Sequence, residues 1–553
     1  MALLAELRRR NVLKVALLYA VTSWLIVWFV GAIQSTAHVP VWTETFVLFV
    51  LAIGFPVALL FAWTYEITPA GLKKAVDVDQ TQSIVYKTGQ KLNAAVLVLG
   101  VLGLLAVFGQ RLLPTFEFIL PGIPEGDAPV SAATPADIRS LTLDNGLEII
   151  VWPDHDIPNV VMYNFVRAGA RNEYPGITGL SHFFEHMMFL GSGEPEPDAF
   201  DRIMEDAGGA NNAYTTADVT VYQDWFPVAA IETIFAIEAE RHENLELLPE
   251  VVESERAVVY SERRTSIDDN NFWKLAEQVV ATAYVAHPYQ FTVIGWPSDI
   301  ESWTLEDLEN YYRTYYAPNN RTLVITGDVT PGEVFELADE YFASIPAQAP
   351  PPPVRTVEPE QLGERRLVVE APAQTPLLHI AFHAGSASDP DAVPMELLLN
   401  VLAGGDSSRL HRILVEDERL AIAVGAYQDE GFDPGLVYLY LTLPSAGDPA
   451  AAERRTLEEL RRIATDGVSD EELAKARNIV LADYWRELAT INGKAAALGQ
   501  YAVFHGSYEK LFDLPATLEA VTAEDLVRVA GKVFRENNMT VGVLRSPAGE
   551  NEE

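Results

Sequence analysis

Two histidines and a glutamate in the order His-x-x-Glu-His stand inside an apolar, helix-favouring segment, Gly179 to Met188. On an α-helix, residues four apart lie one turn apart on the same face. His182 and His186 can therefore direct two imidazoles at one metal ion, and Glu185 lies beside them. Two neutral nitrogens and one carboxylate, with one position left open, are a common way to hold a catalytic zinc. The pattern predicts a zinc site in which Glu185 is placed to act as a general base on a metal-activated water.

A charged, helical segment further along the chain carries two more glutamates. Glu262 lies 76 positions after His186, and Glu255 lies seven residues before Glu262, two helical turns away on the same face. Histidine pairs on apolar helices are often packing features, so the distant glutamates are what favour a metal site. The two-part pattern resembles the M16 metallopeptidases, the inverzincin family of pitrilysin, insulin-degrading enzyme and mitochondrial processing peptidase. The resemblance implies a zinc endopeptidase (hydrolase) with one Zn²⁺ per chain, bound by His182, His186 and Glu262.

The same resemblance suggests further roles. Glu255 would orient a ligand or the metal helix from outside the ligand set, although a surface salt bridge is a simpler account of it. The stretch from Gly208 to Tyr222 resembles the family segment on a sheet edge above the zinc, where peptide substrates add a strand. An ordinary polar hairpin edge has the same composition. The candidate substrate-binding residues are Asn212, Ala213 and Tyr214.

Three apolar stretches precede these motifs, at about residues 15–33, 45–65 (broken only by Pro56) and 92–109. Each is long enough to cross a hydrocarbon core of roughly 30 Å. They predict a three-helix transmembrane anchor over residues 1–111. Basic residues flank the first stretch and fill the loop before the third, which places the N-terminus in the cytoplasm by the positive-inside rule. We therefore expect a multi-pass protein of the bacterial inner membrane, with the peptidase part on the periplasmic side.

The chain of 553 residues carries a net charge of −39 and has no cysteine. The negative charge belongs to the part after residue 111, and such a surface repels nucleic acid, so DNA and RNA are excluded as partners. Without cysteine, disulfides and thiolate nucleophiles are excluded too. The acidic surface is compatible with basic peptide substrates and equally with simple solubility.

After the anchor, helical patterns alternate with short β-rich runs, which predicts an α+β fold. Pro-rich and Gly-rich stretches predict linkers between globular units. The predicted order is a linker at 112–137, a catalytic zinc domain at 138–345, a Pro-rich linker at 346–361, a C-terminal domain at 362–546 and an acidic tail at 547–553.

The two globular units repeat one another. The segment Thr304 to Leu308 recurs 218 positions later as Thr522 to Leu526, and the pair Asn319-Asn320 recurs at the same offset as Asn537-Asn538. The second copy lacks the metal helix. We therefore expect two homologous M16-type α/β units that form a half-clamshell, with the chemistry in the first. The remaining conspicuous histidines, His287, His379 and His383, are interpreted as packing, surface or substrate-lining residues.

The second unit contains Gly404 to Leu410, which resembles a stretch of M16 second domains. Many family members place an Arg and a Tyr seven residues apart just after it, where they stabilise the reacting carbonyl. Here Val415 and Ile422 occupy those positions, and neither side chain can donate a hydrogen bond. Arg409 or Tyr427 could do this work, a partner subunit could supply the pair, or activity could be reduced. The resemblance implies a homodimer or heterodimer with another M16 subunit, and the alternative function is a catalytically silent peptide-binding or assembly subunit.

Overall fold

The computed structural model describes residues 137–190 and 199–547, the short segments 65–68 and 71–74, and the single residues 19, 23, 51 and 55. Contacts divide the chain into two compact units, 1–127 and 128–553. In the first unit, β1 (Tyr65–Thr68) and β2 (Gly71–Lys74) pair as an antiparallel hairpin. The second unit holds all the motifs described above.

The expected multi-pass membrane location is wrong. Among the described residues there is no helix whose length and apolar character would let it cross a membrane. The three expected spans fall almost wholly outside the described residues. Tyr65, the last residue of the second expected span, is extended rather than helical and pairs with Lys74.

The first half of the second unit is built on a six-stranded sheet in the order β3-β4-β8-β5-β7-β6. Its central strand β8 is buried along its whole length, as expected for an apolar run covered on both faces. β4 and β8 are parallel and all other neighbours are antiparallel. The strands are β3 (Arg139–Thr142), β4 (Glu148–Pro153), β5 (Asn159–Val166), β6 (Ala210–Thr215), β7 (Thr220–Pro227) and β8 (Arg321–Gly327).

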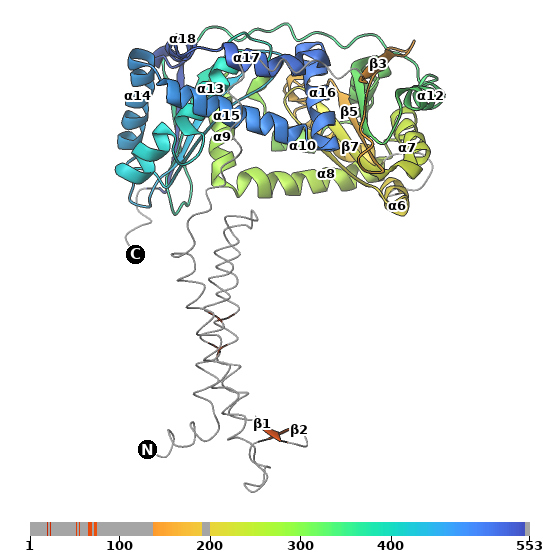
Figure 1. The fold of residues 1–553 in the computed structure, drawn as a ribbon, viewed down its shortest axis with the longest axis horizontal. Helices are drawn as coiled ribbons and strands as arrows, with labels where there is room; N and C mark the ends of the chain where they lie inside the picture. Colours follow the sequence, from red (N-terminus) through yellow and green to blue (C-terminus); the bar gives the residue numbers. More distant parts are fainter. Residues whose placement is uncertain are drawn as a thin grey trace, which may run out of the picture. The chain divides into compact units, whose positions relative to one another are not determined.

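Helices surround this sheet (Figure 1). Several begin at the signals that sequence would suggest: α8 has Pro at its first position, and α11 and α12 each start with a Thr capping box. The helices are α5 (Leu180–Leu190), α6 (Ala199–Asp206), α7 (Ile231–Glu243), α8 (Pro249–Arg263), the π-helical η3 (Arg264–Asp268), α9 (Asn271–Ala283), α10 (Pro297–Ser302), α11 (Leu305–Tyr315) and α12 (Pro331–Phe342), with 3-10 turns η1 (Ala170–Asn172), η2 (Val228–Ala230), η4 (Pro288–Gln290) and η5 (Pro318–Asn320).

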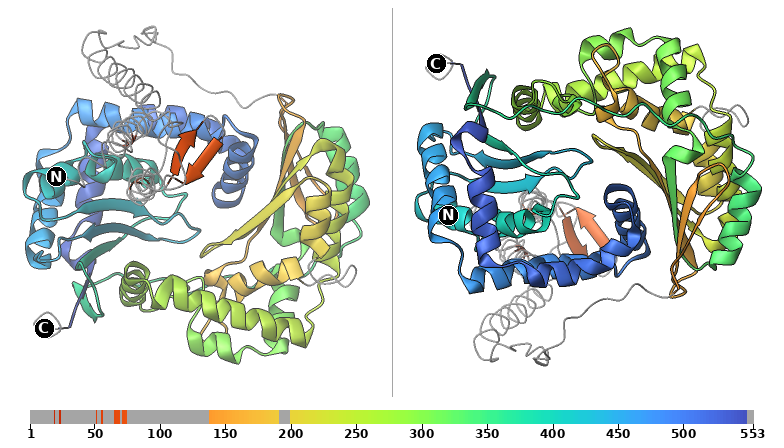
Figure 2. Two further views of the ribbon diagram at one scale, coloured as in Figure 1. Left: turned by 90° about the horizontal axis from the view of Figure 1, so that it is seen from below. Right: turned by 90° about the horizontal axis from the view of Figure 1, so that it is seen from above.

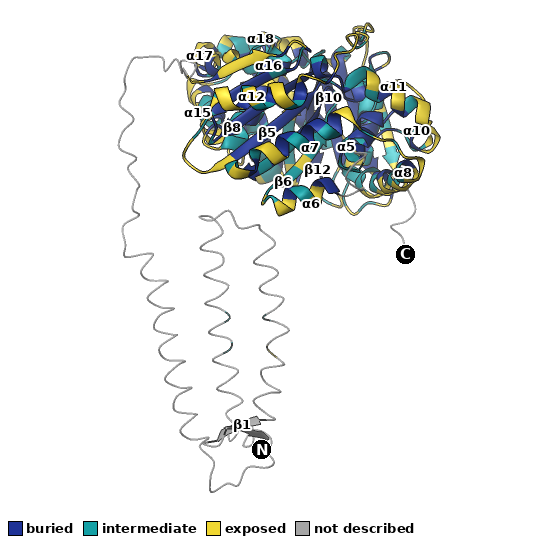
Figure 3. Ribbon diagram, turned by 90° about the vertical axis from the view of Figure 1, so that its right-hand side faces the viewer, coloured by how far each residue is buried: buried dark blue, intermediate teal, exposed yellow. Residues whose placement is uncertain are grey.

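The second half has a five-stranded sheet in the order β11-β12-β10-β13-β9. Its strands are β9 (Arg365–Glu370), β10 (Leu377–His383), β11 (Ala423–Gln428), β12 (Leu436–Thr442) and β13 (Met539–Arg545). Its helices are α13 (Ala392–Ala403), the π-helical η6 (His411–Asp417), α14 (Pro449–Asp466), α15 (Asp470–Glu487), α16 (Ile491–His505), α17 (Leu514–Ala520) and α18 (Ala523–Val533), with 3-10 turns η7 (Tyr508–Asp513) and η8 (Glu536–Asn538). Burial is concentrated in the strands, and the helices expose their outer faces (Figure 3).

The predicted internal repeat is confirmed. Thr304 and Thr522 each begin a capping box, one for α11 and one for α18. The Nδ2 of Asn320 donates to the carbonyl oxygen of Tyr315, and Asn538 makes the equivalent bond to Val533. Strand order and direction also match, since β9 is parallel to β13 as β4 is to β8. Because everything from residue 128 on is one compact unit, the expected domain boundaries stay predictions.

The two halves exchange a helix. α9, from the first half, packs on β9, β10 and β13 of the second, and α16, from the second half, packs on β5 and β8 of the first. Each helix places its apolar residues in the core of the other half's sheet. Gly499 of α16 lies so close to the sheet that a Cβ there would overlap the ring of Phe165. The two sheets are therefore fixed relative to each other within the unit (Figure 2).

Candidate metal centre

The predicted motif lies on α5, and the apolar residues and the motif residues occupy opposite faces of this helix, as their spacing requires. Phe183, Phe184, Met187 and Met188 are buried in an apolar cluster. The motif residues lie on the other side and remain partly exposed. The rings of His182 and His186 have centroids 4.8 Å apart. The pair can therefore face a single ion.

α8 brings Glu262 to the histidine pair. Its Oε2 lies 3.7 Å from Nε2 of His182 and 3.5 Å from Nε2 of His186. One ligand atom from each of the three residues lies within 4.8 Å of the others, and within the described ranges no other trio of His, Cys, Asp or Glu meets this condition. The structure thus brings together the three residues that the sequence places in two distant segments.

The donor set fits zinc. Zn–N bonds of 2.0–2.1 Å and Zn–O bonds of about 2.0–2.2 Å in a tetrahedron put neighbouring ligand atoms about 3.4 Å apart. The separations of 3.5 and 3.7 Å are close to that value. The side chain of Glu262 is 42% exposed, against 12% for His182, so the site is open to solvent on the carboxylate side. An open side is what a catalytic rather than a structural zinc site requires.

Charges at the site already favour a cation. Burial, together with the nearby His186, lowers the pKa of His182 to about 4. Burial acts to lower the pKa of His186 as well, but the carboxylates of Glu255 and Glu262 outweigh it and raise that pKa to about 9. The hydrogen bond from His186 lowers the pKa of Glu262. A bound cation would displace the proton of His186, since ligands must be deprotonated.

Glu185 is held beside the triad. The Oγ1 of Thr215 donates to its Oε2 at 2.6 Å. Burial raises the pKa of Glu185, and the bond from Thr215 partly opposes this. A carboxylate with a raised pKa accepts a proton more readily than an ordinary one, which suits a general base. Thr215 was not predicted, and no sequence signal distinguishes it from the other threonines of this hairpin.

Glu255 contacts the metal helix directly. Its Oε1 lies 2.6 Å from Nδ1 of His186, and its side chain is only 13% exposed. The contact is a largely buried pair between two helices rather than a surface pair along one helix. Whether Glu255 tunes a bound metal stays a prediction.

The end of α8 is anchored by a buried ion pair that the sequence analysis missed. Arg263, next to Glu262, forms two hydrogen bonds with the carboxylate of Glu277 on α9, of 2.5 and 2.7 Å. It also donates to the carbonyl oxygen of Gly295 at 2.8 Å. Both side chains are 4% exposed. The backbone then continues into the π-helical η3, a feature frequent at functional sites.

Two of the three candidate substrate residues, Ala213 and Tyr214, line the same cleft as His182 and Glu262, whereas Asn212 does not line it. Asn212, Ala213 and Tyr214 belong to β6, the strand at the edge of the sheet. A cleft of about 790 Å³ contains His182, Glu185 and Glu262 together with residues 213–218, and residues 427–431 of the second half form another part of its wall. The assignment of Asn212, Ala213 and Tyr214 to substrate binding stays a prediction. Their position on an edge strand is compatible with the addition of a substrate strand.

The other histidines have structural surroundings. His287 is 2% exposed and lies 3.1 Å from Asp433 through Nε2. His379 is 3% exposed and packs against Phe272, with ring centroids 4.7 Å apart. His383 lies 2.9 Å from the carbonyl oxygen of Ala283. None of the three belongs to the group that could hold a metal ion.

The possible substitutes for the missing Arg/Tyr pair differ in their surroundings. Arg409 is held by two 2.7 Å bonds to Glu472 and by the carbonyl oxygen of Gly467, so its guanidinium is occupied. Tyr427 lines the cleft and is 39% exposed. Val415 packs against the core of the second half, and Ile422 is 55% exposed.

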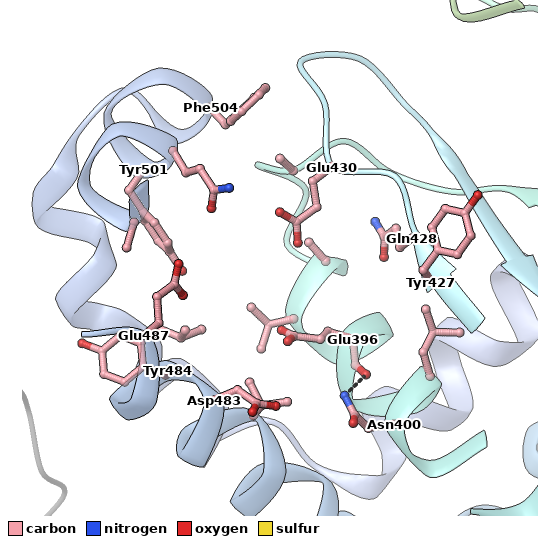
Figure 4. Close-up of a pocket in the computed structure, with 18 of the residues that line it drawn as sticks. Glu396, Asn400, Tyr427, Gln428, Glu430, Asp483, Tyr484, Glu487, Tyr501 and Phe504 are labelled. Carbon is pink, nitrogen blue, oxygen red and sulfur yellow. Dashed lines mark hydrogen bonds between the residues drawn. The ribbon is translucent and has the colours of Figure 1, made fainter. Parts of the chain in front are cut away.

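A second cavity of about 400 Å³ adjoins the cleft and shares Tyr427 and Glu430 with it. Glu430 and Glu487 face one another across this space (Figure 4). Burial and the neighbouring carboxylates of Glu430 and Asp483 raise the pKa of Glu396 to about 7. The cavity extends the acidic character of the cleft into the second half.

Comparison with known proteins agrees with this geometry. The family model described as insulinase (peptidase family M16) matches residues 155–295, and the model described as peptidase M16 inactive domain matches residues 302–480. The zinc protease PqqE of Helicobacter pylori is 29% identical over 416 residues, which cover 74% of this chain and 92% of that protein. The mitochondrial-processing peptidase subunit beta of Lentinula edodes is 26% identical over 416 residues, 73% of this chain and 89% of that protein.

Solved structures share the fold. A protease from Helicobacter pylori superposes with a TM-score of 0.72 at 28% identity, covering 74% of this chain and 99% of that one. A peptidase M16 inactive domain from Pseudomonas fluorescens gives a TM-score of 0.68 at 16% identity over 74% and 99% of the two chains, and this likeness concerns the fold alone.

Proposed function

Because this chain carries both domains of the M16 peptidase family, we propose that it is a zinc-dependent endopeptidase that hydrolyses peptides or unfolded polypeptides. The observation that supports this most is the meeting of His182, His186 and Glu262 around one point, although Glu262 lies 76 positions after His186 in the sequence. Relatives named zinc proteases, including one that this chain covers to 92% of its length, support the same reaction class.

In this proposal His182, His186 and Glu262 hold Zn²⁺. When bound, zinc supplies a Lewis acid that activates water and polarises the scissile carbonyl. Glu185 accepts the proton of the attacking water and then delivers it to the leaving amine. Thr215 holds one oxygen of Glu185, which leaves the other oxygen for this proton. Glu255 keeps Nε2 of His186 directed at the ion by accepting from Nδ1.

The substrate is placed by the sheet edge. β6 pairs with β7 on one side, and an extended peptide adding to the other side would be held through main-chain hydrogen bonds. Such binding selects unfolded segments with little regard to their sequence. The acidic cleft wall contributed by residues 429 and 430 would favour peptides without strong negative charge.

Glu185→Gln tests the proposal. The amide is nearly isosteric but cannot accept the proton, so hydrolysis of a peptide library should fall by a factor of about 10²–10⁴ while zinc content stays at one ion per chain. Glu253, on α8 and with its side chain 69% exposed, provides the control as Glu253→Gln. Peptide cleavage by Glu185→Gln at the wild-type rate would contradict the assigned role.

The alternative, a catalytically silent subunit, has one observation in its favour. Neither Val415 nor Ile422 can donate a hydrogen bond, and Arg409 is already paired. Zinc stoichiometry separates the two functions, since a scaffold does not need a tightly held ion. Purified protein without zinc and without hydrolysis would favour the silent subunit.

We propose further that this chain pairs with another M16 chain. One relative is a mitochondrial-processing peptidase subunit beta, and a solved structure that shares the fold is the first half of the periplasmic protease PqqL of Escherichia coli. A second half-molecule could supply the donors missing at Val415 and Ile422. Light scattering should show a dimer, and a fully active monomer would contradict this.

A further inference from the structure

Glu173 is a buried carboxylate at the beginning of the metal helix. It is 3% exposed. Its Oε2 accepts from the backbone N–H of Gly179, and its Oε1 accepts from that of Ser181, both at 2.7 Å. The first N–H groups of an α-helix have no partner within the helix. Glu173 therefore fixes the first turn of α5, and its second partner directly precedes His182.

The loop between Glu173 and α5 is held at several points near the helix. Gly179 has φ +89, and a Cβ there would overlap the carbonyl oxygen of Ile294. Asp299 accepts from the N–H groups of Gly176 and Thr178, at 2.9 and 3.2 Å, and from the hydroxyl of Thr178 at 2.7 Å. A shift of Glu173 would consequently be passed to the helix rather than absorbed by the loop.

This arrangement is costly for the fold. Burial raises the pKa of Glu173 to about 7, even though the N–H groups of Ser181 and Gly179 act to lower it, and the charge of Asp299 raises it further. The phenol of Tyr311, which bonds to the hydroxyl of Ser181 at 2.5 Å, also faces this region. Apolar residues at such positions are often more stabilising than a buried charge. The two N–H groups need an acceptor, but the cost of burying the carboxylate offsets much of what these bonds contribute to stability, so the main effect of Glu173 is to fix the geometry of this turn.

We propose that Glu173 is a positioning residue of the metal centre, which holds the first turn of α5 so that His182 and His186 reach Glu262. The inference rests on the proposed zinc site. It differs from the role of Glu255, because Glu173 touches no ligand and acts through the backbone of the helix.

The test compares zinc affinity, by chelator competition on the full chain, in Glu173→Gln, Glu173→Asp and Thr522→Ala. The amide of Gln offers one acceptor where two are needed, so its zinc affinity should fall by about 10–100-fold. Asp keeps both acceptors on a shorter arm and should recover part of the loss. Thr522 caps α18 in the other half, so Thr522→Ala should cost about 1 kcal/mol of stability and leave zinc affinity unchanged.

The kinetic readout separates positioning from general damage. For Glu173→Gln, kcat should fall with KM unchanged, because β6 is untouched. Zinc affinity of Glu173→Gln within about twofold of wild type would overturn the inference, and so would an equal loss in Thr522→Ala. If Glu173→Gln does not fold, wild-type affinity in Glu173→Asp overturns it instead. A wild-type chain that binds no zinc contradicts the proposed function itself.

Discussion

The imidazole of His186 and the carboxylate of Glu255 are joined through Nδ1 and Oε1 at 2.6 Å. A carboxylate only accepts, so Nδ1 carries a proton, and Nε2 is the nitrogen whose proton a bound cation would displace. That Nε2 lies 3.5 Å from Oε2 of Glu262. One contact outside the triad therefore decides which nitrogen of His186 faces the metal site.

Glu255→Gln should weaken zinc binding by about 10-fold, because an amide can present its NH₂ to Nδ1 and turn the ring to the other tautomer. Chelator competition measures the change. Glu253→Gln, two residues earlier on α8 with its side chain 69% exposed, should leave the affinity unchanged. Equal affinities for wild type and Glu255→Gln would remove Glu255 from the site.

The exchanged helix α16 should tolerate no side chain at Gly499. Gly499→Val places methyl groups on the ring of Phe165 and should destabilise the protein by about 1–3 kcal/mol, seen as a lower Tm. Gly531 of α18 has open space around its Cα, so Gly531→Ala should instead stabilise by about 0.5–1 kcal/mol. A Tm of Gly499→Val equal to wild type would mean that α16 packs elsewhere.

The sequence was sufficient for features that depend on local spacing. The histidines four apart and the repeat that relates Thr304 to Thr522 follow from helix geometry and duplication, and both appear in the structure. The exchange of α9 and α16 was not predictable, because an apolar helix face indicates burial without indicating which sheet covers it. The apolar stretches before residue 112 led to a membrane location that the described helices do not support.

The site itself was predicted to the extent that its residues have a motif. His182, His186 and Glu262 fall in the recognised pattern, whereas Thr215, Arg263 and Glu173 do not. Thr215 and Arg263 bond to side chains of other elements, and Glu173 bonds to two backbone N–H groups at the beginning of α5. Such contacts depend on tertiary packing, and one sequence contains no spacing rule for them.

Arg263→Met should be strongly destabilising. It leaves the buried carboxylate of Glu277 without its cationic partner, with only the hydroxyl of Thr292 still donating to it, which costs about 3–5 kcal/mol. Replacing both, as Arg263→Met with Glu277→Leu, removes the buried charge and should restore much of the Tm. Zinc affinity should remain reduced in the double variant, because the end of α8 that carries Glu262 loses its anchor to Gly295. Full recovery of zinc affinity would show that the ion pair serves stability alone.

Glu173 should make stability depend on pH in a defined direction. Burial raises its pKa from an ordinary 4.5 to about 7, so between these values the folded chain holds a proton that the unfolded chain has lost. The stabilising contribution is complete below about pH 4.5 and is lost as the pH rises through about 7, up to about 3 kcal/mol in all. Glu173→Gln has no such titration. The Tm of wild type relative to this variant should therefore fall between about pH 5 and about pH 8, and a constant difference across that window would show that Glu173 is ionised throughout and that its burial costs the fold little.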